Sequence, residues 1–157
     1  MKTKLASTVA ALALIAGLGL APVLSSAPAY AVDNMSSTDA PDLTSVRTKI
    51  KANDYAGALA ELRHLADDVQ HADVYNLMGY ALRKSGDFKT SLTYYTKAIE
   101  MQPEHKAARE YLGELYVETG NMEKAKEQLA VLAKLCPGGC EEREDLQKAI
   151  NAKSASN

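Results

Sequence analysis

The sequence predicts an all-α solenoid of three helix–turn–helix repeats, closed by a C-terminal capping helix. Apolar residues fall at helical spacing from about residue 42 to residue 151, and no segment alternates like a strand. Two glycines and a proline also recur after 34 positions. The recurring pairs are Gly79/Gly113, Gly86/Gly120 and Pro103/Pro137. A period of this length is typical of stacked helical units, which hold partners more often than they catalyse reactions.

The first 31 residues have the pattern of an export signal. Two early lysines are followed by an apolar stretch over residues 5–24, and the Ala-Tyr-Ala of residues 29–31 fits the cleavage rule. Cleavage there leaves 126 of the 157 residues, starting at Val32. We therefore expect a periplasmic protein with no stable membrane insertion after cleavage; the alternative is an uncleaved anchor.

The charge of the mature chain bears on its partners. Removing the leader removes two lysines, so the formal net charge changes from −2 to −4. Nucleic-acid binding needs a basic surface that displaces counterions. The acidic balance therefore argues against nucleic acid as a partner.

The elements follow in order along the chain. Residues 32–41 are polar and are expected to form a flexible tether, and Asp42 can cap the first helix. The expected helices are 42–52, 55–68, 72–84, 88–101, 105–119, 122–135 and 141–152. They give repeats at about 42–71, 72–105 and 106–139, a cap helix at 140–152 and a disordered tail at 153–157.

The turn inside each predicted pair has the same two-residue chemistry. Its first residue is Gly or Asn, which can take the left-handed conformation that ends a helix. Its second residue is Asp or Asn, which can cap the following helix. The three turns are Asn53-Asp54, Gly86-Asp87 and Gly120-Asn121. Pro103 and Pro137 are expected to end the second helices.

Small residues inside the helices indicate close packing. Gly79 and Gly113 would each cost about 1 kcal/mol in a helix interior. They are therefore expected where a facing helix approaches the backbone. Leu146, Ala149 and Ile150 give the last helix one apolar face, which is expected to cover the open end of the stack.

The repeats resemble the tetratricopeptide family. The second repeat carries Tyr75, Met78-Gly79, Leu82, Ser91, Tyr95, Ala98 and Pro103 at the family's positions, and the third carries Leu112-Gly113, Tyr116, Ala125, Leu129, Leu132 and Pro137. The first repeat matches mainly in its second helix, at a spacing of 33. The resemblance implies a right-handed α-solenoid that acts as an adaptor or assembly factor in the cell envelope.

The resemblance also implies where a protein or peptide partner would bind. First-helix residues of the family line a concave groove that holds a peptide or helix. Carried over, these positions are Asn76, Tyr80, Arg83, Lys84, Glu110, Tyr111, Glu114 and Glu118. The three glutamates form a stripe that would prefer a basic or mixed-charge segment. The alternatives are that these are ordinary solvated positions, or that an exposed repeat face mediates self-association.

The only two cysteines, Cys136 and Cys140, flank Pro-Gly-Gly between the third repeat and the cap helix. In an exported chain they are expected to form a disulfide that clips the cap to the solenoid. The alternative is a thiol-redox or copper-handling protein that acts through this pair.

Catalytic signals are weak. His64 and His71 lie two helical turns apart, about 10 Å, so they cannot chelate one ion together. With His105 they are expected to be exposed helix-end residues. No phosphate loop, nucleophile elbow or zinc pattern is present. The sequence therefore predicts a protein that is not an enzyme and has no cofactor or metal.

Overall fold

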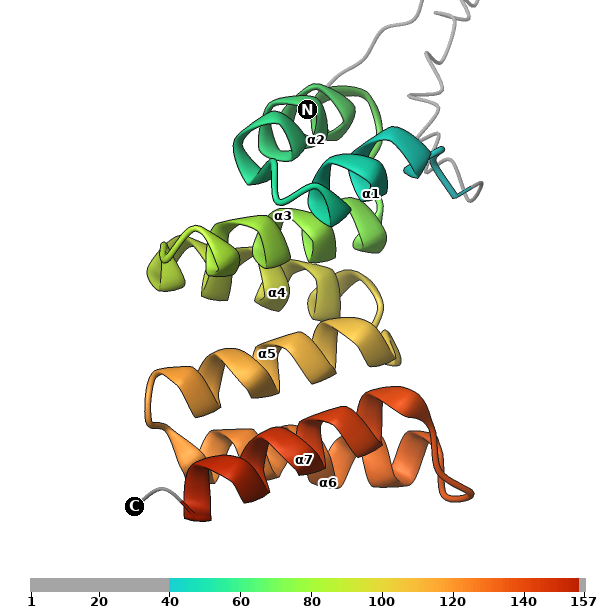
Figure 1. The fold of residues 1–157 in the computed structure, drawn as a ribbon. Helices are drawn as coiled ribbons and strands as arrows, with labels where there is room; N and C mark the ends of the chain where they lie inside the picture. Colours follow the sequence, from blue (N-terminus) through green and yellow to red (C-terminus); the bar gives the residue numbers. More distant parts are fainter. Residues whose placement is uncertain (1–39, 156–157) are drawn as a thin grey trace, which may run out of the picture. The chain divides into compact units, whose positions relative to one another are not determined.

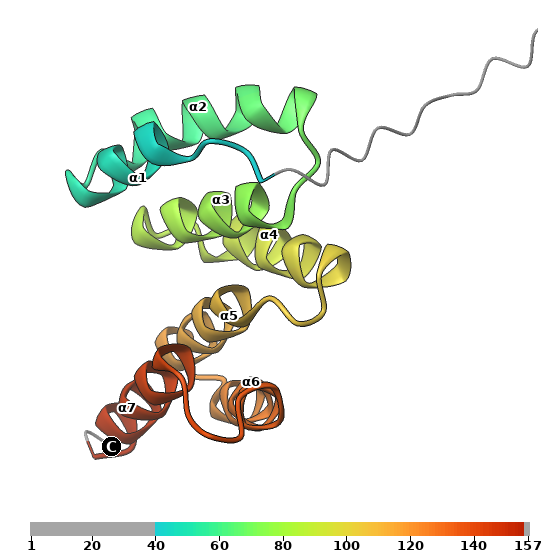
Figure 2. The same cartoon turned by 90° about the vertical axis from the view of Figure 1, so that its right-hand side faces the viewer.

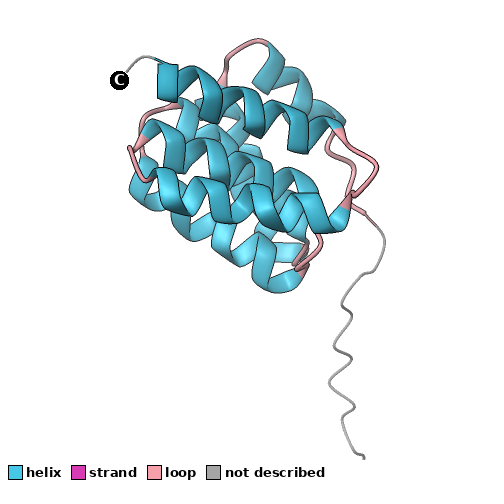
Figure 3. Cartoon of the chain, turned by 90° about the horizontal axis from the view of Figure 1, so that it is seen from below, coloured by secondary structure: helices cyan, strands magenta, loops and turns pink. Residues whose placement is uncertain are grey.

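The computed structural model of this chain describes residues 40–155. Regular structure in this range is helical throughout, with seven helices and no strand (Figure 3). This confirms the predicted all-α fold. The predicted signal peptide and all but the end of the predicted tether lie outside the described residues, so those two expectations stay untested.

Six helices form three consecutive pairs that stack in chain order, and the seventh follows the last pair (Figure 1). The helices are α1 (Thr44–Lys51), α2 (Tyr55–Asp68), α3 (Ala72–Lys84), α4 (Phe88–Met101), α5 (Lys106–Glu118), α6 (Met122–Leu135) and α7 (Glu141–Ala155). Each of the first six begins and ends within two residues of its predicted bounds.

The last helix is longer than expected. It continues to Ala155, so residues 153–155 are helical and do not belong to a disordered tail. No glycine or proline interrupts this segment, and the Ser154 hydroxyl donates to the Ile150 carbonyl at 2.9 Å. The end of the apolar pattern at Ile150 therefore does not mark the end of the helix.

The predicted turn chemistry is confirmed at all three pairs. The residue that ends the first helix has a positive φ: 60° at Asn53, 84° at Gly86 and 80° at Gly120. The side chain after it accepts from the N–H three residues further on. The distances from the side-chain Oδ1 to the backbone N are 2.9 Å for Asp54 and Gly57, 3.1 Å for Asp87 and Thr90, and 3.4 Å for Asn121 and Lys124.

The two interior glycines lie where another helix approaches the backbone, as expected. A Cβ on Gly79 would lie 2.6 Å from the Tyr95 ring of α4, and one on Gly113 would lie 2.4 Å from Leu146 of α7. The Ser91 hydroxyl donates to the Gly79 carbonyl at 2.7 Å in the same buried contact. A larger residue at either position would therefore require the facing side chain to move.

Packing of α7 confirms its predicted role as a cap. It lies against both α5 and α6 (Figure 2). Leu146 and Ile150 are buried in one apolar cluster with Val117 and Leu132. The apolar face of α7 therefore covers the surface that a fourth pair would otherwise cover.

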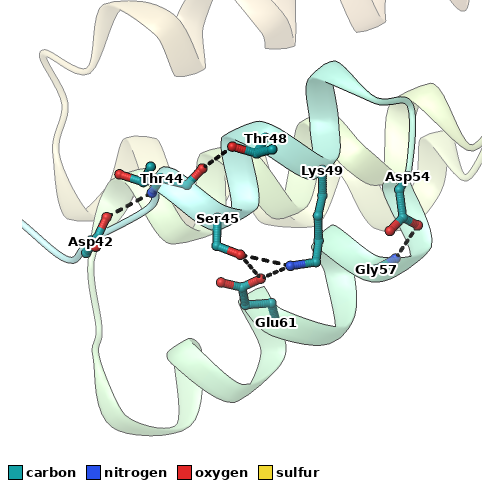
Figure 4. A network of polar contacts seen from close by, with 8 residues as sticks. All are labelled: Asp42, Thr44, Ser45, Thr48, Lys49, Asp54, Gly57 and Glu61. Carbon is teal, nitrogen blue, oxygen red and sulfur yellow. Dashed lines mark hydrogen bonds and ion pairs between the residues drawn. The ribbon is translucent and has the colours of Figure 1, made fainter.

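A polar network joins the first two helices (Figure 4). Lys49 Nζ lies 2.6 Å from Glu61 Oε2, and the Ser45 hydroxyl donates to the same oxygen at 3.0 Å. The Asp42 carboxylate accepts from the Thr44 N–H at 2.9 Å, so it caps the helix from just before its start. Lys49 is therefore engaged in an ion pair between α1 and α2.

Candidate functional site

A pocket of ≈ 170 Å³ is lined by the first helices of all three pairs. Its residues are Arg47, Ile50 and Lys51 of α1, Leu77 and Tyr80 of α3, and Tyr111 of α5. We call it the α1–α3–α5 pocket. Because each pair contributes side chains, the pocket exists only once the three pairs have stacked.

Two tyrosines form the aromatic wall of this pocket. The ring centroids of Tyr80 and Tyr111 lie 5.0 Å apart with planes tilted by 58°, a favourable edge-to-face arrangement. Burial raises the pKa of Tyr80 and raises the pKa of Tyr111 to about 12. Both phenols therefore stay neutral at physiological pH and can donate hydrogen bonds to a ligand.

The α1 side of the pocket is basic. Arg47 and Lys51 are exposed and form no ion pair with any described residue, whereas Lys49 is paired with Glu61. Lys84 of α3 is also exposed, and its Nζ lies 5.4 Å from the centre of the Tyr80 ring. The pocket thus joins an aromatic wall to two positive charges without an ion pair among the described residues, although Arg47 also acts on the Asp73 carboxylate and helps to lower its pKa.

Arg83 is buried beneath this surface and not displayed on it. Its side chain is 1% exposed, and its guanidinium binds Glu114 and Glu118, each at 2.6 Å. The guanidinium carbon lies 5.5 Å from the centre of the Tyr80 ring and 5.8 Å from that of Tyr111. Arg83 therefore ties α3 to α5 and supports both tyrosines from behind.

This pairing changes the expected character of the acidic stripe. Glu114 and Glu118 share the single positive charge of Arg83, so one negative charge remains among the three, and Glu110 is only 8% exposed. Burial raises the pKa of Glu110 to about 8, with further contributions from Glu114, Asp145 and Glu142. Glu110 is therefore mostly protonated at neutral pH. The stripe predicted to attract a basic segment holds less free negative charge than the sequence indicated.

The eight predicted partner-binding residues separate into two groups. Tyr80 and Tyr111 line the pocket, and Lys84, Glu114 and Glu118 lie near it with partly or fully exposed side chains. Asn76, Arg83 and Glu110 are buried instead, at 3%, 3% and 8% exposure. Helical spacing places residues on a face, but the depth of each residue depends on how closely the next helix packs.

Sequence reasoning missed the α1 half of the pocket. A signal was available, because the first repeat matches the second at a spacing of 33. That spacing aligns Arg47, Ile50 and Lys51 with Tyr80, Arg83 and Lys84. The first helix lacks the Leu-Gly pair. Its residues could therefore be aligned with those of the second repeat only by extending the match of the second helices backward along the chain.

A second cluster joins the starts of α3 and α5. His71 and His105, also 34 positions apart, each accept a backbone N–H through Nδ1, from Asp73 and Ala108 respectively. His105 Nε2 lies 2.9 Å from Asp73 Oδ1, and this hydrogen bond is the first cause that lowers the pKa of Asp73. Since Nδ1 accepts, Nε2 carries the proton and donates.

The expectation of exposed histidines is therefore wrong for His105, which is 8% exposed. It lies between its own helix start and the carboxylate of the preceding repeat. Its role in the structure is to cap α5 and to link that helix to α3.

The sulfurs of Cys136 and Cys140 lie at disulfide distance, 2.06 Å apart. The bond closes the loop between α6 and α7, where Gly139 has a φ of 99° and Arg143 Nη1 donates to the Cys136 carbonyl at 3.4 Å. This geometry agrees with the predicted clip. A broad hollow of ≈ 520 Å³ borders the loop, but it is lined by this loop and α7 alone.

Residues 76–139, which span α3 to the disulfide loop, match a family model described as tetratricopeptide repeat. Residues 76–139 are tetratricopeptide repeats. A search of curated proteins finds no match to its sequence. The match covers the second and third repeats, and α1 and α2 extend the tetratricopeptide stack by one more pair.

Among residues 40–155, no group of three or more His, Cys, Asp or Glu side chains is arranged to hold a metal ion. None of the helices in this range has the length and apolar character that crossing a membrane requires.

Proposed function

We propose that this tetratricopeptide protein is an adaptor or assembly factor of the cell envelope. It binds a peptide or helix of another protein across the first helices of its repeats. The observation that carries the proposal is the α1–α3–α5 pocket, to which every repeat contributes side chains. Tetratricopeptide repeats are in general protein-binding scaffolds, so the family supports the same function.

The pocket has the composition of a recognition surface. Tyrosine supplies a large contact area and a hydrogen-bonding hydroxyl at a low entropic cost, and tyrosine is enriched where interfaces gain most of their energy. Tyr80 and Tyr111 are held from behind by the buried Arg83, so little ordering is needed when a partner binds.

We place the protein in the periplasm on two grounds. Residues 1–31 have the pattern of a cleavable export signal, and the only two cysteines lie at disulfide distance. Disulfides persist in oxidising compartments and are rare in reducing ones. The mature adaptor is expected to begin at Val32.

A capture experiment tests the function. The tagged chain is expressed from its full sequence, recovered from periplasmic extract, and its bound proteins and its own N-terminus are identified by mass spectrometry. Tyr80→Ala is compared with Phe88→Ala, which removes an aromatic ring that is 38% exposed on α4 and does not line the pocket. Circular dichroism confirms that both variants are folded.

We expect a partner that is retained by wild type and by Phe88→Ala and is lost by Tyr80→Ala. A partner retained by all three proteins would place the binding site elsewhere. The light-scattering mass of the purified chain separates partner binding from self-association. A chain that still carries residues 1–31 would contradict the proposed cleavage and favour the uncleaved anchor.

A further inference from the structure

We propose that the α1–α3–α5 pocket docks an acidic peptide segment. One phenylalanine or leucine side chain of the segment fills the hollow, and the neighbouring Asp or Glu side chains meet Arg47 and Lys51. This inference rests on the proposed function and names the chemistry of the partner. It reverses the partner charge that the glutamate stripe alone indicated.

The size of the hollow sets the apolar part of the ligand. A cavity of about 150 Å³ is large enough to bind a benzene ring, and this pocket measures ≈ 170 Å³. Its walls include Ile50, Leu77 and the two tyrosines. One side chain of the size of phenylalanine or leucine therefore fills it, whereas alanine leaves most of it empty.

Charge complementarity sets the polar part. Arg47 and Lys51 are four residues apart on α1, so they project from the same face of the helix. Both line the pocket, both are exposed, and neither has an ion-pair partner among the described residues. An acidic side chain of the peptide, next to its apolar group, could form an ion pair with either residue.

The acidic residues of the groove lie outside the lining of the pocket. Glu114 and Glu118 bind the buried guanidinium of Arg83, and Glu61 of α2 binds Lys49 of α1. The two charged side chains that do line the hollow, Arg47 and Lys51, are both positive.

Isothermal titration calorimetry with blocked peptides tests this inference on the mature disulfide-bonded chain. The probe is acetyl-Gly-Glu-Phe-Glu-Gly-amide. One comparison peptide replaces both glutamates by lysine, and another replaces phenylalanine by alanine. The amide end removes the terminal carboxylate, so any acidic preference must come from side chains.

The protein variants are the double change Arg47→Glu with Lys51→Glu and the control Arg63→Glu. Arg63 is exposed on α2, lies outside the pocket and forms no ion pair with a described residue. The control therefore reverses one charge in the same helix pair but outside the pocket. Both variants alter exposed side chains and are expected to fold, which circular dichroism checks.

We expect the probe to bind more tightly than either comparison peptide and to lose affinity as salt is added. The double variant should weaken its binding by about tenfold or more, while Arg63→Glu leaves it unchanged. Equal or tighter binding of the lysine peptide would overturn the inference, as would unchanged binding to the double variant or no binding of the probe.

The capture experiment separates this inference from the proposed function. If Tyr80→Ala loses a partner and the acidic probe fails, the groove binds protein of another chemistry, and only this inference falls. If Tyr80→Ala retains every partner and the probe does not bind, both the proposed binding site and this inference are wrong.

Discussion

Arg83 and Glu110 are ionisable side chains that lie inside the helix stack, and their neighbours decide their charge. Arg83 keeps its charge because two carboxylates bind it, at 2.6 Å each. Glu110 has no ion-pair partner among the described residues, so burial favours its neutral form. Arg83 is thus buried in its charged form, and Glu110 is buried mainly in its neutral form. Each case leads to a prediction about the stability of a variant.

The first prediction concerns the Arg83 ion pairs, in which the cation is buried and both carboxylates are partly exposed. Replacing Glu114 and Glu118 together by Gln leaves a guanidinium that is 1% exposed without a counter-charge, which costs about 3 kcal/mol or more. Arg83→Met leaves two carboxylates that are 24% and 40% exposed and can be hydrated, while Met fills the space. We therefore expect the double glutamate variant to be the less stable of the two.

Urea unfolding followed by circular dichroism measures both free energies of unfolding. Equal stability of the two variants, or a more stable double glutamate variant, would mean that water reaches the guanidinium in spite of its burial. The same result would argue that Arg83 contributes through packing against the tyrosines and not through its charge.

The second prediction concerns pH. The pKa of Glu110 in the folded chain, about 8, lies above its ordinary value of 4.5. The folded state thus binds the proton more tightly than the unfolded state does. Its stability is greatest below pH 4.5 and falls as the pH rises toward 8. Glu110→Gln cannot ionise, so it should raise Tm at pH 9 by on the order of 5 °C.

Near pH 4.5 the gain from Glu110→Gln should largely disappear, because the wild-type carboxyl is then protonated in the folded state. Glu127→Gln, at an exposed position on α6, is the matched control and should change Tm little at either pH. A gain for Glu110→Gln that does not change between pH 4.5 and pH 9 would exclude ionisation as its cause.

At the scale of elements, the cap helix α7 is stabilised from two directions. Its apolar face packs on α5 and α6, and the disulfide at Cys136 and Cys140 fixes the loop that leads into it. Closing a five-residue loop contributes about 2 kcal/mol in the chain-entropy model. Neither cysteine lines the α1–α3–α5 pocket, so the clip and the binding surface should be separable.

We expect Cys136→Ser to lower the free energy of unfolding by about 2 kcal/mol and to leave peptide binding at the pocket unchanged. Cys140→Ser should behave identically, and reduction of the wild type should reproduce both. Differential scanning calorimetry and titration of the peptide probe measure the two properties. Loss of binding at unchanged stability would favour the thiol-redox or copper-handling alternative instead.

At the scale of the whole described unit, the pocket depends on stacking three repeats. Its six lining residues come from α1, α3 and α5, which no short segment of sequence brings together. The buried contact between Gly79 and Tyr95, and that between Gly113 and Leu146, set how closely neighbouring helices approach. Binding at the pocket should therefore be sensitive to packing at positions that no partner touches.

Most of the fold could be predicted because its signals are local. A positive-φ residue followed by a capping side chain ends one helix and begins the next, and this pair appears at Asn53, Gly86 and Gly120. Apolar spacing fixed which face of α7 would be buried. The missed caps at His71 and His105 are local contacts too, and the 34-residue period that aligns the two histidines could have indicated them.

The sequence alone thus determined the helices, their turns, the repeat family and the cap, since each depends on residues a few positions apart or on a fixed period. The tertiary structure alone decided which groove residues are free to bind. Arg83, buried between α3 and α5, pairs with two glutamates of the predicted stripe, while Arg47 and Lys51 line the pocket without an ion pair among the described residues. Charge and depth depend on neighbours more than 30 residues away, and no local pattern records those neighbours.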